Sequence, residues 1–149
     1  MGLLFHPVHM AIVFVVCILF LIPAIFYLLT LQSALGKCPP PSRTMDPAMV
    51  WLLLIPIFSL IWGFFVVMAL AKSLGNEFRR RGIPTPDPLP GQSLGMAMCI
   101  CACCGIIPLL GVLASLVALV LWIMYWIKIA EFSRLLDLPA AAIPAPPAY

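Results

Sequence analysis

The chain has 149 residues, of which 64% are hydrophobic and only 9% are charged, and its mean hydropathy is +1.18. A water-soluble domain carries charge on roughly a quarter of its residues, so this chain cannot cover a surface that faces water, and we expect an all-α protein of the lipid bilayer. The net charge of +3 is too small and too dispersed to predict nucleic-acid binding. Six cysteines in a short chain can indicate a disulfide framework, but five of these lie inside apolar runs, which does not fit that pattern.

The apolar runs between charged residues predict four membrane-spanning helices, each able to cross a hydrocarbon core of about 30 Å or most of it. The first run lacks the basic start and the cleavage site of a signal peptide, so we expect it to stay as a span. Asp46 and Pro47 suit the N-cap and first position of the second helix. The third run has room for two short spans, joined at "GIIPLLG". The four spans are expected over 9–31, 48–72, 92–107 and 109–128, with mid-span kinks at Pro23 and Pro56.

The basic residues predict the orientation of these spans. Six of the eight follow the second or the fourth predicted span, and an even number of spans places them on the same side as the N-terminus. The positive-inside rule then predicts a four-helix bundle with both termini in the cytoplasm. The expected cytoplasmic residues are Lys72, Arg79, Arg80, Arg81, Lys128 and Arg134, and the expected outer ones are Lys37 and Arg43.

Two of the spans are expected to continue into the cytoplasm as short helices. "AKSLGNEFRRRG" extends the second one, with a Glu77–Arg81 pair at i,i+4, and "IKIAEFSRLLDLP" extends the fourth. The cluster Arg79, Arg80 and Arg81 is expected to meet anionic lipid headgroups, with plain topological charge as the alternative. Residues 1–138 then form one transmembrane domain, and the Pro/Ala-rich tail 139–149 is expected to be an extended, polyproline-like chain.

Small residues predict where the helices approach one another, because lipid provides no hydrophobic drive for helix association and close van der Waals contact must replace it. Such residues recur at helical spacing in the third and fourth spans, which we expect to form the tightest pair. The predicted packing residues are Gly91, Gly95, Cys99 and Cys103 on the third span, and Gly111 and Ser115 on the fourth.

The four cysteines of "CICACC" allow three interpretations. A metal site is not expected, because no histidine or carboxylate lies inside a span to complete a ligand set. Cys101 and Cys104 form a C-x-x-C motif, as used by four-helix thiol oxidoreductases of the vitamin K epoxide reductase class, and Cys38 is available as a further partner or as a bridge to Cys103 or Cys104. The motif lies at a helix C-terminus, however, where the helix dipole disfavours a thiolate. The favoured interpretation is that these cysteines are small residues of a packing face.

The stretches "VWLLLIPIFSLIW", "SLGNEFRRRG" and "YWIKIAEFS" resemble segments shared by a family of small bacterial multi-span membrane proteins with a V-W-L-x-L-I-P-x-F core motif. The resemblance covers roughly residues 42–136. It implies a four-span architecture and the bacterial inner membrane, and it supplies no catalytic, cofactor-binding or metal-binding residues.

From these observations we expect a non-enzymatic accessory or scaffold subunit that packs against other membrane proteins or against itself, with the bilayer as its other partner. Two alternatives remain: a membrane thiol-disulfide oxidoreductase that uses Cys101 and Cys104, and a small homo-oligomeric channel or transporter. No cofactor is expected, because no phosphate loop, nucleophile elbow or intramembrane charge is present.

Overall fold

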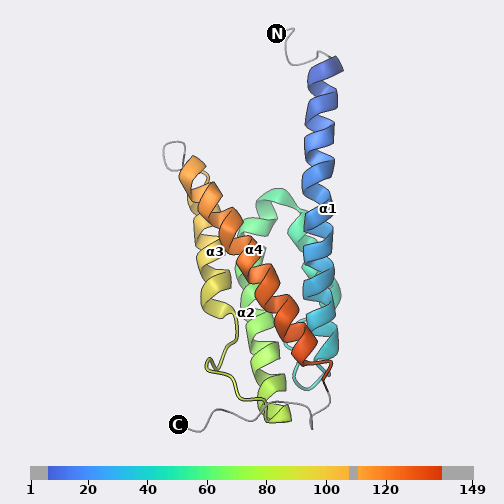
Figure 1. Cartoon of the computed structure of the whole chain (residues 1–149), viewed down its shortest axis with the longest axis vertical. Helices are drawn as coiled ribbons and strands as arrows, with labels where there is room; N and C mark the ends of the chain where they lie inside the picture. Colours follow the sequence, from blue (N-terminus) through green and yellow to red (C-terminus); the bar gives the residue numbers. More distant parts are fainter. Residues whose placement is uncertain (1–6, 108–110, 139–149) are drawn as a thin grey trace.

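The computed structural model describes residues 7–107 and 111–138, and this part of the chain consists of helices joined by turns and loops, with no strand. The elements are α1 (Pro7–Lys37), the 3-10 helix η1 (Pro47–Leu54), α2 (Pro56–Arg81), α3 (Gln92–Cys104) and α4 (Gly111–Leu135) (Figure 1). Three of these helices, α1, α2 and α4, are long and apolar enough to cross a membrane, which suggests an integral membrane protein. The prediction of an all-α membrane protein is confirmed at this level.

The segment expected to be one continuous second helix is instead two helices joined by a sharp turn. Asp46 caps the first of them as expected, and its carboxylate accepts a hydrogen bond from the backbone N–H of Ala48 (2.8 Å). That helix is the eight-residue η1, and it ends where Ile55 adopts an extended conformation. Pro56, expected to kink a helix from within, is the first residue of α2, a position where its missing N–H costs no helical hydrogen bond. Pro23 does lie inside α1.

The first and last helices run in the same direction. Trp126 of α4 donates a hydrogen bond to the Thr30 hydroxyl of α1 (2.9 Å), and Lys37 and Ser133, each seven residues further along its own helix, are joined by a 2.9 Å hydrogen bond. A constant offset of 96 residues is the register of two parallel helices. The start of α1 and the end of α4 accordingly lie at opposite ends of the molecule (Figure 1). Four successive crossings require the first and last helices to be antiparallel, so the four-span bundle with both termini on one side is not confirmed.

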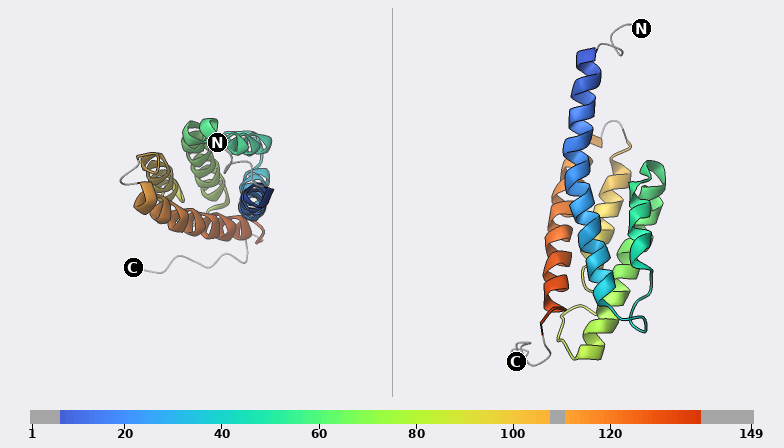
Figure 2. Two further views of the ribbon diagram at one scale, coloured as in Figure 1. Left: turned by 90° about the horizontal axis from the view of Figure 1, so that it is seen from above. Right: turned by 90° about the vertical axis from the view of Figure 1, so that its right-hand side faces the viewer.

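After α1, the chain forms two helical hairpins, each with a short rising arm and a long returning arm. In the first hairpin, Thr44 donates a hydrogen bond to the carbonyl of Ala69 (2.8 Å) and Trp62 donates one to the carbonyl of Met49 (3.0 Å), so η1 is antiparallel to α2. The second hairpin is α3 and α4, the pair in the most extensive contact. The three long helices α1, α2 and α4 therefore run in one direction, and the short arms η1 and α3 run in the opposite direction (Figure 2).

The two long arms of the hairpins continue beyond the predicted spans, as the sequence suggested. α2 extends to Arg81 and ends at Gly82, whose φ of 69° lies in the left-handed region that favours glycine. α4 extends to Leu135. The predicted turn residue Pro108 and the tail 139–149 lie outside the described residues.

The buried core lies in only one half of the molecule, toward the ends of the three long helices. Side chains of α1 are buried from Tyr27 onward, and those of α2 are mostly buried from Val66 to Phe78. In the other half, every described residue from Pro7 to Ile22 is exposed, and so is most of α4 before Trp122. Apolar side chains left exposed in this number are expected where lipid or another membrane protein covers them.

Candidate functional site

Gly95 of α3 is the predicted packing residue with the tightest surroundings. A Cβ added at this position would lie 2.6 Å from Cγ1 of Val67 on α2 and 2.8 Å from Cε2 of Tyr125 on α4. Gly95 is therefore enclosed between two helices rather than facing α4 alone, and only a residue without a side chain fits there without displacing its neighbours.

The other predicted glycines and serine are distributed along the α3–α4 pair. Gly91 directly precedes α3 with a φ of 77°, and a Cβ there would lie 3.4 Å from Ile129 of α4, so Gly91 both makes the turn into α3 and lies against α4. At the opposite end of the pair, a Cβ at Gly111 would lie 2.6 Å from the carbonyl oxygen of Gly105, and a Cβ at Gly105 would lie 3.0 Å from Oγ of Ser115. Close approach at both ends fixes how α3 lies against α4.

Within the cysteine cluster of α3, Cys99 is the residue that lies against α2. Cys99 is buried, and its Sγ lies 3.4 Å from the position that a Cβ on Gly63 of α2 would occupy. Cys101, Cys103 and Cys104 are partly exposed, and all six cysteines of the chain have free thiols. Cys99 is thus the member of the cluster that fills a helix interface.

Cys38 does not approach the C-x-x-C motif. It directly follows α1 at the packed end of the molecule, where its Sγ lies 3.7 Å from the carbonyl oxygen of Ser73 on α2, whereas Cys101 and Cys104 lie at the far end of α3. Burial, together with the negative charge of Glu77, raises the pKa of the Cys38 thiol to about 11. Cys38 is therefore a poor nucleophile that lies far from the C-x-x-C motif. The predicted alternative of a disulfide from Cys38 to Cys103 or Cys104 is not formed.

The three arginines predicted to meet lipid headgroups are held by contacts within the protein. Glu77, whose side chain is fully buried, accepts hydrogen bonds from Arg80 (2.6 and 2.8 Å) and Arg81 (2.6 Å), and the Glu77–Arg81 pair has the i,i+4 spacing expected from the sequence. Arg81 also donates to the carbonyl of Leu136 beyond α4 (2.7 Å), and Arg79 donates to the carbonyl of Pro88 (3.3 Å). The side chain of Arg80 remains about half exposed and is the one best placed to meet an external anion.

Two close approaches on α2 were missed by the sequence analysis, which considered small residues only on the third and fourth spans. One is Gly63 against Cys99, described above. The other is Gly75, where a Cβ would collide with the backbone carbonyl of Pro88 in the segment that leads to α3. The spacing of Gly63 and Gly75 along one apolar helix was the available signal, but it does not show which neighbour each glycine meets.

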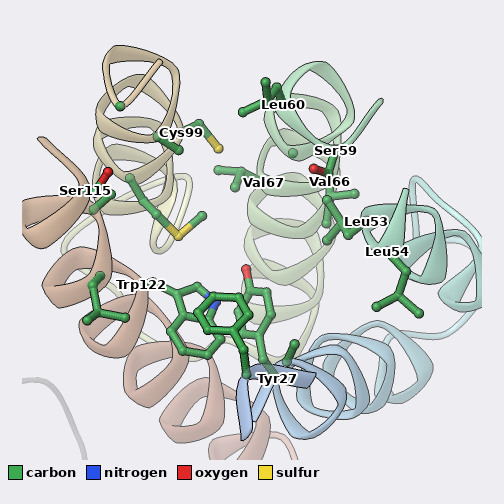
Figure 3. Close-up of a pocket in the computed structure, with 18 of the residues that line it drawn as sticks. Tyr27, Leu53, Leu54, Ser59, Leu60, Val66, Val67, Cys99, Ser115 and Trp122 are labelled. Carbon is green, nitrogen blue, oxygen red and sulfur yellow. The ribbon is translucent and has the colours of Figure 1, made fainter. Parts of the chain in front are cut away.

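The described structure contains a central well of about 980 Å³, which lies in the half away from the basic residues. All five helices contribute to its wall, for example through Phe20 of α1, Leu53 of η1, Val67 of α2, Cys99 of α3 and Trp122 of α4 (Figure 3). No charged residue of the described chain lines it. Its size and apolar lining are typical of sites for small hydrophobic molecules, which often lie between the helices of bundles.

One polar group points into the bottom of this well. The hydroxyl of Tyr27 is directed toward the centre of the cavity in Figure 3, although only 7% of the Tyr27 surface is exposed. Its ring is fixed by edge-on contacts with Trp122 (centroids 5.4 Å apart) and Trp126 (6.3 Å). Ser59 and Ser115 add hydroxyls to the wall, but the Ser59 hydroxyl already donates to the carbonyl of Pro56 (2.6 Å). No sequence motif marked Tyr27, because the partners that orient it lie about 95 residues away.

Comparisons with known proteins identify no relative of this chain: no family model matches it, and no match is found among curated proteins or solved structures. The site must therefore be interpreted from its own geometry.

Proposed function

We propose that the protein is a non-enzymatic accessory or scaffold subunit of the membrane, which acts by packing against other membrane proteins. The observation that carries this proposal is the exposed half of α1. Sixteen consecutive residues, 7–22, are exposed in the described structure, and all are uncharged. This half of the helix extends beyond both hairpins (Figure 2). A long apolar rod fixed at one end to a packed core is suited to lie along the helices of a partner.

We further propose that the N-terminus and the C-terminus lie on opposite sides of the membrane. Lys37 contacts Ser133 and Asp137 at the end of α4, and Arg43 precedes Thr44, which is bonded to α2. All eight basic residues of the chain therefore lie in the same half as the core, rather than six on one side and two on the other. The positive-inside rule favours the cytoplasm for this end, and the family resemblance favours the bacterial inner membrane.

The lengths of the helices support this orientation. At 1.5 Å per residue, the 31 residues of α1 extend about 46 Å, more than the hydrocarbon core of about 30 Å, whereas the 13 residues of α3 extend only about 20 Å. α2 and α4 are also long enough to cross, but each follows an arm, η1 or α3, that is too short to return the chain across the bilayer. A chain with one complete crossing and two hairpins that return to their side of entry therefore fits these lengths. At the first turn, the backbone N–H of Ser59 donates to the carbonyl of Ile55 (2.8 Å) and that of Ile55 donates to the carbonyl of Leu52 (3.2 Å), so these groups are satisfied within the turn.

A site-specific photo-crosslinker tests the packing role. It is placed at Val15 or Leu19 in the exposed half of α1, and at the equally exposed Ile127 of α4 as a matched control. We expect one discrete protein adduct from the α1 positions that co-purifies with the untreated protein in mild detergent, and lipid adducts alone from Ile127. An adduct of twice the mass of the chain identifies self-association, and lipid adducts alone from all three positions contradict the proposal.

Reporter fusions test the orientation separately. Alkaline phosphatase is active only outside the cytoplasm, so a fusion at Pro40, between α1 and the first hairpin, reports on which side that end of α1 lies. For the proposed orientation, we expect inactive fusions both at Pro40 and after Leu138. An active fusion at Pro40 contradicts this orientation, and an active fusion at Pro40 with an inactive one after Leu138 favours the four-span arrangement.

A further inference from the structure

We propose that the central well binds a neutral lipid whose buried end carries a carbonyl oxygen, and that the Tyr27 hydroxyl donates a hydrogen bond to this oxygen. This inference concerns the inside of the well, which shares only Phe20 with the exposed half of α1, so it does not depend on the subunit-packing role proposed above.

The surroundings of the well favour a ligand that enters from the bilayer. The well lies in the half away from the basic residues, where the nearby side chains of α1 and α4 are mostly apolar and exposed. Its volume of about 980 Å³ is at the upper end of the range for small-molecule sites. Water would gain few hydrogen bonds from such a lining, and an apolar molecule would restore the contacts that an empty cavity lacks.

The lining also limits the chemistry of the ligand. A charged headgroup would lose its hydration inside the well without finding an opposite charge, because no charged residue of the described chain lines the cavity. Phosphate-bearing lipids and free fatty acids in the ionised form are therefore disfavoured. A neutral molecule with an apolar chain fits the wall.

Tyr27 provides a hydroxyl deep in the cavity, next to Trp122, whose indole nitrogen also lies in the wall. Each fully enclosed side-chain nitrogen or oxygen among the described residues has a hydrogen-bond partner. No hydrogen bond within that part of the chain ends on the Tyr27 hydroxyl, which points into the cavity (Figure 3). The hydroxyl is therefore not fully enclosed but opens into the cavity, where it is a donor that a ligand acceptor would satisfy. Carbonyl oxygens of this kind occur in quinone rings and in the esters of diacylglycerols, which share the chemistry.

Binding of defined probes tests the proposal with the full-length protein in dodecyl maltoside, a detergent that has no carbonyl group. The probes are decylubiquinone, 1,2-dioctanoylglycerol and, as a carbonyl-free control, pentadecane. The thermal unfolding midpoint measured against probe concentration gives the apparent affinity. We expect at least one carbonyl probe to raise the midpoint more than pentadecane, and the stronger of the two carbonyl probes identifies the source of the carbonyl.

Three variants locate the site. Tyr27→Phe removes one oxygen and keeps the ring, so it should fold normally and weaken carbonyl-probe binding about 2- to 12-fold, the loss expected for one neutral hydrogen bond. Ala118→Phe fills the wall of the well and should abolish binding, whereas Val120→Phe, on the same helix but outside the well, should leave it unchanged.

The proposal is overturned if neither carbonyl probe shifts the midpoint of the unsubstituted protein, or if pentadecane shifts it equally. It is also overturned if Tyr27→Phe binds the carbonyl probes with unchanged affinity. Because Tyr27→Phe preserves the packing, this last measurement remains decisive if Ala118→Phe fails to fold.

Discussion

The two halves of this molecule use the same apolar helices in opposite ways. In the half that carries the basic residues, α1, α2 and α4 converge on a closed core that includes the buried carboxylate of Glu77. In the other half, the same helices diverge around an open well and an exposed length of α1. The difference shows that hydropathy alone does not decide burial in a membrane protein. Close contacts at glycines occur in both halves, whereas the polar cross-links between helices, such as Lys37 with Ser133 and Trp126 with Thr30, are concentrated in the first half.

Two similar sequences within the packed half also differ in burial. α2 and α4 leave the core through similar sequences, Glu77-Phe78-Arg79-Arg80 and Glu131-Phe132-Ser133-Arg134, and the two phenylalanine rings meet edge-on with centroids 5.7 Å apart. Glu77 is nevertheless fully buried, whereas Glu131 is exposed. The same local pattern thus has a structural role on one helix and a solvent-facing position on the other.

The largest effect is expected from Gly95→Leu, which would add a branched side chain between Val67 and Tyr125 where even a Cβ lies too close. Overpacking typically costs about 1–3 kcal/mol, and we expect the upper part of this range because two helices are displaced. The measurement is a thermal melt in detergent beside Val120→Leu, a change on the exposed face of α4. If Gly95→Leu melts no lower than this control, α3 does not pack through this face.

The next effect is expected from Glu77→Gln, which keeps the shape of the side chain and removes its charge. Breaking a buried ion pair costs about 3–5 kcal/mol when the partner stays buried. Arg80 and Arg81 are partly exposed and can turn to water, so we expect a smaller loss, about 1–3 kcal/mol. Glu131→Gln is the matched control and should change stability by less than about 0.5 kcal/mol. Equal losses of stability from Glu77→Gln and Glu131→Gln would show that the buried carboxylate contributes no more to stability than the exposed one.

A smaller effect is expected from Asp137→Ala, which removes the ion pair of Lys37 with the end of α4 (2.6 Å). The Asp137 side chain is 59% exposed, and exposed pairs contribute at most about 1 kcal/mol and weaken as salt is added. Melts of this variant at 0.05 M and 1 M NaCl should therefore differ from those of the unsubstituted protein only at low salt. A loss that persists at high salt would show that the residue has a role beyond charge pairing.

The smallest effect is expected from the double substitution Cys101→Ala and Cys104→Ala. Both side chains are only partly buried, and alanine is also small, so the helix contacts should survive. We expect the melting midpoint and the crosslinking pattern of α1 to remain within experimental error of the unsubstituted protein. Loss of function in a well-folded double variant would revive the thiol oxidoreductase interpretation.

Part of this architecture follows from local sequence. The apolar runs specify helices because every backbone polar group in lipid must be satisfied within its own segment. Asp46 specifies a cap, Gly82 specifies the end of α2, and Glu77 specifies a pair with Arg81 four residues later, because each of these interactions joins residues within one turn of helix.

The remaining features depend on contacts between residues far apart in the chain. The break at Ile55 requires the η1 backbone to fold back along α2, and nothing local distinguishes this from a kinked helix. The parallel register of α1 with α4 is set by Trp126 on Thr30 and Lys37 on Ser133, pairs separated by 96 residues. The sequence by itself determined which segments are helical and apolar. Only the tertiary structure decided their directions, the burial of Glu77 and the enclosure of a well above Tyr27, because these depend on which helices meet rather than on what each helix is made of.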